Sequence, residues 1–213
     1  MALAAAATNA TIGDREMVEV YTSLKSNDDP IPVLIRSSAA SPIAKALLLY
    51  KPDDLVVVTG SLSLDKEGNT PELYVHTCCP AYPDQYLNNV SLTGRIGNES
   101  RVSESSKSCS RSVAVNRYSN GEQLTDWFKI RGYGNWRDRL QNAEKGSLTE
   151  VEGQLESRTN RNGDPYCEVK VRHAVVHSRS KSSAGNPAAG TNAVGYDHDA
   201  FSGIDTAPFD WND

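Results

Sequence analysis

The sequence of 213 residues lacks several features that mark common classes of protein. It contains no run of eighteen apolar residues, so we expect no membrane-spanning helix. None of its cysteines, Cys78, Cys79, Cys109 and Cys167, has the C-x-x-C spacing of a zinc site, and the adjacent pair cannot easily form a disulfide. We therefore predict reduced thiols in a cytoplasmic protein. The opening M-A-L-A-A-A-A-T-N-A has no basic segment, which makes it a poor signal peptide and predicts a loose terminus.

Signatures of catalysis are also missing from the sequence. The histidines, His76, His173, His177 and His198, show no ligand spacing with Asp, Glu or Cys. The segments G-R-I-G and I-R-G-Y-G are too short to be nucleotide-binding loops, and no nucleophile motif is present. We predict that the protein is not an enzyme and that it has no catalytic residues, no metal site and no cofactor.

Positive charge is absent from residues 182–213, which contain five Asp and neither Lys nor Arg. Residues 1–87 are also acidic, with a net charge of −5. Residues 88–181 carry 16 basic and 11 acidic residues, a net charge of +5. The net charge of −5 for the whole chain therefore conceals a basic module, and a basic module with an acidic tail favours a nucleic-acid partner.

The segment T-D-W-F-K-I-R-G-Y, residues 125–133, is the most informative part of the chain. Side chains alternate along a strand, so rings and cations would share one face: Trp127, Lys129, Arg131 and Tyr133. Phe128 and Ile130 would point toward a core, with Gly132 leaving room beside them. Because rings stack on bases and cations attract phosphates, this pattern predicts a strand that binds single-stranded nucleic acid.

Residues 88–178 show the pattern of three strands, one helix and two further strands. The helix is expected near residues 135–146, with Asn135 as its N-cap and Gly146 as its stop. Its apolar stripe is Trp136, Leu140 and Ala143, so we expect Trp136 to anchor the core rather than to stack on a base. This order of elements is typical of an OB-fold, a five-stranded Greek-key barrel, and Gly153 would permit a tight bend in one strand.

The last two predicted strands flank the turn T-N-R-N-G-D and complete the predicted site. Arg158 and Arg161 belong to this hairpin, and cations on the final strand share a face with Glu168. The opposite face of that strand carries Cys167, Val169 and Val171. The predicted nucleic-acid-binding residues are Tyr118, Trp127, Lys129, Arg131, Tyr133, Arg158, Arg161, Tyr166, Lys170 and Arg172.

An internal repeat links residues 31–75 to the second half of the chain at an offset of 93 to 95 residues. The matching pairs are Ile35-Arg36 with Ile130-Arg131, Gly60 with Gly153, Pro71 with Pro165 and Val75 with Val169. An ordered series of matches predicts two copies of one fold, although the strands before Ile31 cannot be assigned. The predicted fold class is all-β with one helix per domain, a pair of tandem OB-folds followed by a disordered acidic tail.

The two copies differ in chemistry, and this difference predicts three regions. Residues 1–84 contain no Trp or Phe and are acidic, so we expect a degenerate OB-fold that packs or assembles. Residues 88–179 are expected to be the OB-fold that binds single-stranded DNA. Residues 180–213 are expected to be a disordered tail. Its acidic, aromatic tip is typical of a docking motif for partner proteins: Asp205, Pro208, Phe209, Asp210 and Trp211.

Five segments of the second half resemble a known family: N-N-V-S-L-T-G-R-I-G, S-V-A-V-N-R, T-D-W-F-K-I-R-G-Y-G, E-K-G-S-L-T-E-V-E-G-Q-L and P-Y-C-E-V-K-V. They are similar to the bacterial single-stranded DNA-binding protein family, over residues 88–178. The resemblance implies an OB-fold that wraps single strands at the nucleoid, in replication, recombination and repair. It implies stacking by Tyr118, Trp127 and Tyr133, and a homodimer that supplies four OB-folds.

The sequence departs from that family at two places. Family members often carry a Trp on the last hairpin, whereas R-T-N-R-N-G-D has Arg158 and Arg161 but no ring, so contact there is expected to be ionic. Family tails typically end on Pro-Phe, whereas Pro208-Phe209 is followed here by four further residues.

Three functions are open on this evidence. The first is sequence-independent binding of single-stranded DNA, with a tail that recruits replication and repair proteins and competes with DNA for the basic face. The second is an RNA-binding or primosome-type OB accessory protein, because no residue that reads the 2′-hydroxyl can be identified. The third is an assembly protein whose OB-folds bind only protein, and whose tryptophan fluorescence would not respond to oligo-dT.

Overall fold

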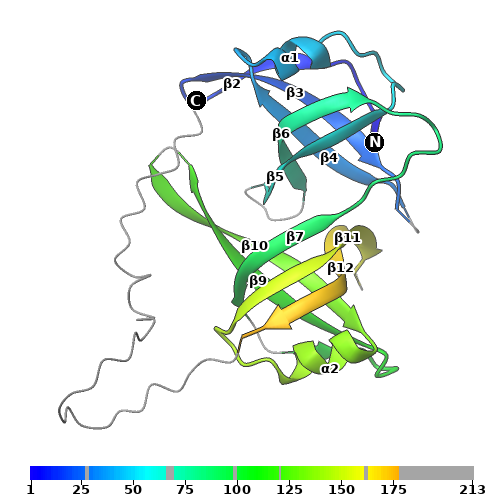
Figure 1. The fold of residues 1–213 in the computed structure, drawn as a ribbon, viewed down its shortest axis with the longest axis vertical. Coiled ribbons are helices and arrows are strands. Elements are labelled where there is room, and N and C mark those ends of the chain that lie inside the picture. The colour runs from blue at the N-terminus through cyan, green and yellow to red at the C-terminus, as the bar shows by residue number, and fades with distance from the viewer. Residues whose placement is uncertain (27–28, 66–69, 98–99, 120, 161–162, 178–213) are drawn as a thin grey trace, which may run out of the picture.

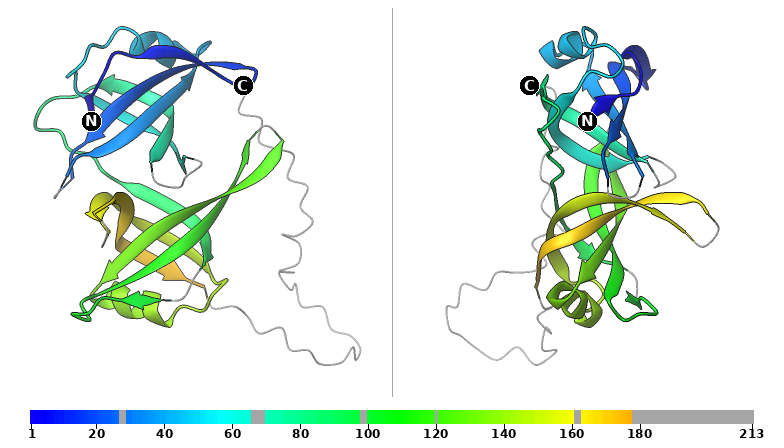
Figure 2. Two further views of the ribbon diagram at one scale, coloured as in Figure 1. Left: turned by 180° about the vertical axis from the view of Figure 1, so that it is seen from behind. Right: turned by 90° about the vertical axis from the view of Figure 1, so that its right-hand side faces the viewer.

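The computed structural model describes residues 1–26, 29–65, 70–97, 100–119, 121–160 and 163–177. Within this part of the chain, two β-sheets are each rolled into a barrel and are stacked along the long axis of the molecule (Figure 1). A long hairpin of the second barrel extends toward the first (Figures 1 and 2). None of the helices in the described residues is long and apolar enough to span a membrane.

The first sheet has the strand order β1-β3-β4-β6-β5, with β2 paired to β3. Its elements are β1 (Ala2–Leu3), β2 (Thr8–Ile12), β3 (Arg15–Leu24), β4 (Ile31–Ser38), α1 (Pro42–Leu47), β5 (Val56–Leu64) and β6 (Pro71–Pro80). An antiparallel bridge between Ala2 and Leu55 joins β1 to the segment before β5 and closes the barrel. The helix α1 begins after Ser41, whose side chain accepts a hydrogen bond from the Ile43 amide.

The N-terminus is part of this barrel, and the predicted loose terminus is therefore wrong. Leu3 is 1% exposed and belongs to the core. The Met1 ammonium donates a hydrogen bond of 2.8 Å to the Val56 carbonyl, and the Val56 amide donates one of 2.9 Å to the Met1 carbonyl. Met1 and Leu3 supply the apolar contacts and backbone bonds that fix a strand of only two residues.

The second sheet closes on itself, because β10 pairs with both ends of the path β12-β11-β7-β9. Its elements are β7 (Val90–Ile96), β8 (Arg101–Val102), β9 (Ser108–Ser119), β10 (Glu122–Tyr133), α2 (Asn135–Asn142), β11 (Leu148–Thr159) and β12 (Pro165–Val176). Every pairing in it is antiparallel except β10 with β12. This is the predicted five-stranded barrel with one helix before the fourth strand, and the prediction of tandem OB-folds is confirmed.

Helix α2 is bounded differently from the prediction. Gly134, with φ of 52°, is the N-cap in place of Asn135, and the helix ends at Asn142 with Ala143 as C-cap, before Gly146. The buried Arg111 on β9 donates to the carbonyls of Leu140, at 3.1 Å, and Ala143, at 3.0 Å. These bonds satisfy acceptors at the C-terminal end of the helix, so a side chain from the barrel fixes where the helix stops.

The internal repeat is visible in the backbone of both barrels. The register between β5 and β6 shifts at Gly60, and that between β11 and β12 shifts at Gly153. A Cβ at either glycine would collide with a carbonyl of the partner strand, which explains why each bulge carries glycine. Gly60 pairs with Val75 and Gly153 with Val171, so Val75 corresponds to Val171, and by the same register Pro71 corresponds to Cys167. The predicted matches of Val75 with Val169 and of Pro71 with Pro165 are therefore wrong.

The β11–β12 hairpin extends further than its counterpart in the first barrel. Counted from the bulge, the β5–β6 ladder ends at the pair Leu64–Pro71, whereas the β11–β12 ladder continues for two more residues on each strand, to Thr159–Pro165. The first barrel is thus the more compact copy. The ends of its strands lie against the second barrel.

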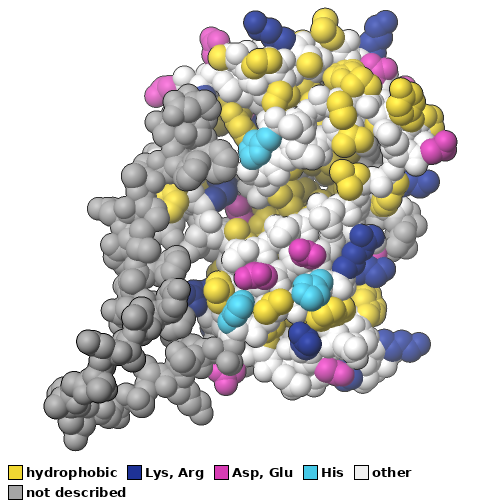
Figure 3. All heavy atoms as spheres, viewed as in Figure 1, with side chains coloured by type: hydrophobic (Ala, Val, Ile, Leu, Met, Phe, Trp, Pro, Cys, Tyr) yellow, Lys and Arg dark blue, Asp and Glu magenta, His cyan; other side chains and the backbone are white. Residues whose placement is uncertain are grey.

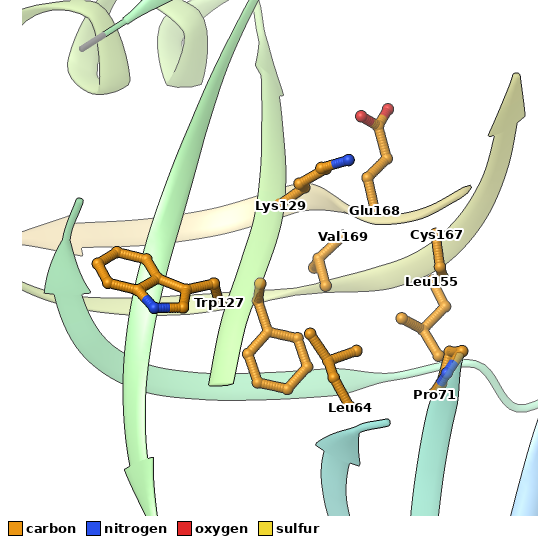
Figure 4. Close-up of a pocket in the computed structure, with 9 residues that line it drawn as sticks. Leu64, Pro71, Trp127, Lys129, Leu155, Cys167, Glu168 and Val169 are labelled. Atoms are coloured by element: carbon orange, nitrogen blue, oxygen red, sulfur yellow. The ribbon is translucent and has the colours of Figure 1, made fainter. Parts of the chain in front are cut away.

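The two barrels meet at an apolar seam. Leu64 and Pro71 of the first barrel lie next to Leu155 of the second and, with Phe128, line a small cavity between them (Figure 4). A hydrogen bond also joins the two barrels, since the Ser157 amide donates to the Ser26 hydroxyl at 3.2 Å. Because Phe128 and Leu155 are 3% and 6% exposed, the seam continues the core of the second barrel.

Candidate nucleic-acid interface

Three aromatic rings stand on the outer face of the β9–β10 ribbon. Trp127 is 54% exposed, Tyr118 48% and Tyr133 36%, whereas Phe128 and Ile130 between them are buried. Tyr118 on β9 lies opposite Gln123 on β10. The three rings are therefore spaced along the ribbon as residues 123, 127 and 133 of β10 would be. At about 3.3 Å per residue this row is about 33 Å long. The alternation predicted for residues 125–133 therefore places exposed rings in line over a buried core.

Trp127 is seated at the seam between the barrels. A Cβ at Gly97 would collide with its six-membered ring, so the glycine provides the surface on which the indole lies. Leu64 of the first barrel lines the same small cavity as Trp127. Figure 4 shows that Lys129 and Glu168 point away from Leu64 and Pro71. The indole is thus supported on one side and is half exposed on the other.

Arg131, predicted to attract phosphate, is bound to a carboxylate of the barrel. Its Nε donates to Glu168 Oε1 at 2.6 Å, and Glu168 is 2% exposed. Further bonds join its guanidinium to Ser108 Oγ and Tyr166 Oη, each at 3.3 Å. Burial is the largest single influence on the guanidinium and lowers its pKa, but the hydrogen bond to Glu168 and the charges of Glu168, Tyr166 and Tyr133 together raise the pKa above its usual value. An ion pair with a buried carboxylate holds this cation in place.

Two further cations from the predicted site join the same network. Arg158 donates to Glu168 Oε1 at 3.1 Å and to Glu156 Oε2 at 2.8 Å. Lys170 donates to Glu156 Oε1 at 2.9 Å, and Glu156 is 3% exposed. Burial alone would raise the pKa of Glu156, but hydrogen bonds from Lys170 and Gln154 lower it below the usual value. Glu156 is therefore held as an anion, and the two carboxylates together accept hydrogen bonds from three cations.

The network also fixes two tyrosines. Arg158 Nη2 donates to the Tyr133 hydroxyl at 3.1 Å, and Arg131 holds Tyr166 in the same way. The ammonium groups of Lys129 and Lys170 lie over the rings of Tyr166 and Tyr133, 4.3 Å and 5.8 Å from the centroids. Rings on β10 and β12 are thus contacted by cations on other strands of the barrel.

Lys129 and Arg172 differ from the other predicted cations. Neither forms an ion pair with the residues that the structure describes. Lys129 is exposed above the Tyr166 ring, and Arg172 donates to the Gln154 amide oxygen. Figure 3 shows basic and acidic side chains interspersed over the second barrel on the viewed face, which agrees with paired rather than segregated charge.

Some of the predicted site lies outside the described residues. This holds for Arg161 of the last hairpin and for the whole tail tip, Asp205, Pro208, Phe209, Asp210 and Trp211. The sequence analysis missed Glu156, Gln154 and Gly97. Glu156 was detectable in principle, because polar residues occupy alternate positions in E-G-Q-L-E-S-R. They therefore lie on one face of this strand, next to the side chains on the same face of β12. Among the described residues, no group of three or more His, Cys, Asp or Glu side chains could hold a metal ion.

Trp136 lies in α2, away from the row of exposed rings. It is half-buried, packs against the core, and meets His173 edge-on with 5.1 Å between ring centroids. Its position agrees with the predicted core anchor. The aromatic face of the barrel therefore consists of Tyr118, Trp127, Tyr133 and Tyr166, and it excludes the second tryptophan of this barrel.

Comparisons with known proteins agree on the fold. The crystal structure of the wild-type single-stranded DNA binding protein from Thermus aquaticus matches with a TM-score of 0.62 and 18% identity, and covers 86% of this chain and 93% of that one. A deletion mutant of that protein matches with a TM-score of 0.59 and 15% identity, over 86% and 94% of the two chains. The TM-scores show a shared fold, and at these low identities the likeness shows the fold alone. No curated protein sequence matches this chain.

The family model described as "Single-strand binding protein family" matches residues 87–181, which include the whole second barrel with its row of rings. This match confirms the resemblance predicted from the sequence. Over residues 87–181, which are less than half of the chain, the protein is therefore similar to the single-strand binding protein family.

Proposed function

We propose that the second barrel binds single-stranded DNA without regard to its sequence. The observation that carries the proposal is the row of exposed rings, Tyr118, Trp127 and Tyr133, on a barrel that matches the single-strand binding protein family. Bases stack on rings whatever their identity, and each stacked base contributes about 1–3 kcal/mol. Rings that are mounted on a closed barrel are already ordered before the strand arrives, which lowers the cost of binding.

Titration with oligo-dT tests this function directly. Binding should quench the fluorescence of Trp127, because the indole stacks on a base, and the same oligonucleotide labelled with a dye should give a saturable rise in anisotropy. Oligo-rU of equal length, added as competitor, separates DNA binding from the RNA-binding alternative. If oligo-dT causes no quenching and no rise in anisotropy at low salt, the proposal is rejected, and a barrel that binds only protein is favoured.

The first barrel has a supporting role in this proposal. It contains no Trp or Phe, and the ends of β5 and β6 pack against the second barrel at the seam. We assign it to assembly rather than to base stacking. A homodimer would bring four barrels together, and light scattering should then give twice the chain mass of 23.1 kDa.

A role in replication, recombination and repair, with partner proteins recruited by the acidic tail, completes the proposal. The five aspartates of residues 182–213 complement the net charge of +5 on residues 88–181, so the tail would compete with DNA when DNA is scarce. Removal of residues 197–213 should tighten binding of oligo-dT at low salt, or leave it unchanged, and the effect should vanish as salt is raised. A clear loss of affinity on truncation would contradict the competition.

A further inference from the structure

The same ion pair occurs at the same place in both barrels. In the second barrel, β10 and β12 run parallel with Ile130 opposite Val169, and Arg131 binds Glu168. In the first barrel, β4 and β6 run parallel with Ile35 opposite Leu73, and Arg36 binds Glu72. By register, Arg36 corresponds to Arg131 and Glu72 to Glu168. An arginine on the third strand of the barrel thus pairs with a glutamate on the fifth strand in each copy.

The repeated pair indicates what the arginine does. Arg36 occupies a barrel without Trp or Phe, and it binds two carboxylates, Glu19 and Glu72. The first barrel lacks these stacking rings, so the role of Arg36 there is to join β4 to the strands that carry its two carboxylate partners. Arg131 has the same position and the same partner, so its presence on the aromatic face is no evidence of phosphate contact.

The second barrel has enlarged this pair into a network beneath its rings. Glu168 accepts from Arg158 as well as from Arg131, and Glu156 accepts from Arg158 and Lys170. The extra members lie on the part of β11 and β12 that flanks Tyr133 and Tyr166. The counterpart of Glu156 by register is Ser63, and that of Lys170 is Tyr74, so the first barrel lacks both additional charges.

We propose that Glu156 and Glu168 are positioning residues of the DNA-binding face, which withhold Arg131, Arg158 and Lys170 from phosphate and orient Tyr133 and Tyr166 through them. The inference rests on the proposed function, since it concerns how the second barrel divides its binding between rings and charge. The face binds bases through a pre-ordered row of rings. Its ionic contacts with phosphate come from the predicted cations outside the network. Among the described residues, these are Lys129 and Arg172.

The test is the dependence of oligo-dT affinity on salt, measured by anisotropy between about 50 mM and about 200 mM salt. For single strands, the slope of log K against log salt changes by about 0.7 for each phosphate that a cation neutralises. In Glu168→Gln, Arg131 loses its carboxylate partner, so the slope should steepen by about 0.7. Glu156→Gln, which releases Lys170, should act in the same direction and serves if Glu168→Gln fails to fold.

Matched variants separate this effect from a simple change in net charge. Glu72→Gln removes the corresponding carboxylate of the first barrel and adds the same charge to the chain, yet it should leave the slope unchanged. Arg131→Gln should also leave the slope unchanged, whereas Lys129→Gln should make it shallower by about 0.7. The double variant Glu168→Gln/Arg131→Gln should return to the wild-type slope.

Three results would overturn the inference. One is an unchanged slope in both Glu168→Gln and Glu156→Gln, and another is an equal steepening in Glu72→Gln. The third is a shallower slope in Arg131→Gln, which would show that this arginine already contacts phosphate. In each case oligo-dT is still bound, so the proposed function survives, whereas a wild-type protein that does not bind oligo-dT would reject both.

Discussion

Replacement of Trp127 with alanine should weaken binding of oligo-dT about 5- to 150-fold while the protein remains folded. The indole is 54% exposed and stands in the middle of the row formed with Tyr118 and Tyr133. A base stacked on a ring contributes about 1–3 kcal/mol, and each 1.4 kcal/mol is about a factor of ten in affinity. Loss of the central platform also divides the row into two separated rings, so the upper part of this range is expected for long oligonucleotides.

Labelled oligo-dT and anisotropy are the appropriate measurement, because the variant lacks the tryptophan whose quenching reports binding. Trp136→Ala is the matched control, since it removes the other indole of the same barrel. Trp136 is half-buried against the core and contacts His173, so its loss should lower the free energy of unfolding and leave affinity at low temperature nearly unchanged. The reverse pattern, with affinity lost in Trp136→Ala and kept in Trp127→Ala, would show that the DNA lies over α2.

The faces of single strands could be read from the sequence with good accuracy. Residues 125–133 alternate between exposed and buried as predicted, because a strand with one face in a barrel core permits only one phase of the pattern. The repeat was also detectable, since Gly60 and Gly153 mark bulges that only glycine can occupy without a collision. These features depend on local sequence: the alternation is set by burial of one strand face, and each bulge by sterics at a single glycine.

Contacts between strands could not be read in this way. Arg131 and Glu168 are 37 residues apart and belong to strands that meet in parallel, so their ion pair depends on a register that neither strand encodes alone. The alignment of Val75 with Val169 failed for the same reason, because the longer β11–β12 hairpin was not visible in the spacing. The strand at Ala2–Leu3 was missed because two residues show no periodicity.

The pairing of charges changes the meaning of the strand from Trp127 to Tyr133. In the sequence its rings and cations have equal weight as binding groups. In the structure Arg131 is held by Glu168, whereas Lys129 forms no ion pair with the described residues, so the two cations have different roles. If the face binds DNA as proposed, a count of its basic residues therefore overstates the ionic part of the binding energy, and the rings contribute a larger share.

Replacement of Phe128 with alanine should lower the free energy of unfolding by about 3–5 kcal/mol, with little direct effect on stacking. Phe128 neighbours Trp127 on β10 but points inward and is 3% exposed. Its ring fills the seam together with Leu64 of the first barrel and Leu155 of the second. The vacated volume would be bordered by strands of two closed barrels, which cannot easily collapse into it, so the full cost of a cavity is expected.

Urea denaturation, followed both by tryptophan fluorescence and by far-ultraviolet circular dichroism, measures this effect and tests how the barrels are coupled. The fluorescence change on unfolding reports the second barrel through Trp127 and Trp136, because the first barrel contains no tryptophan and Trp211 belongs to residues 182–213, outside both barrels. Circular dichroism reports both barrels. Leu124→Ala is the control, since Leu124 lies on the same side of β10 as Phe128 but is 37% exposed. Its loss should change the free energy of unfolding by less than about 0.5 kcal/mol. If the seam joins the two cores, both signals should move together to lower urea in Phe128→Ala. A circular dichroism curve with two transitions, of which only one moves with the fluorescence signal, would show that the barrels unfold independently and that the seam contributes little.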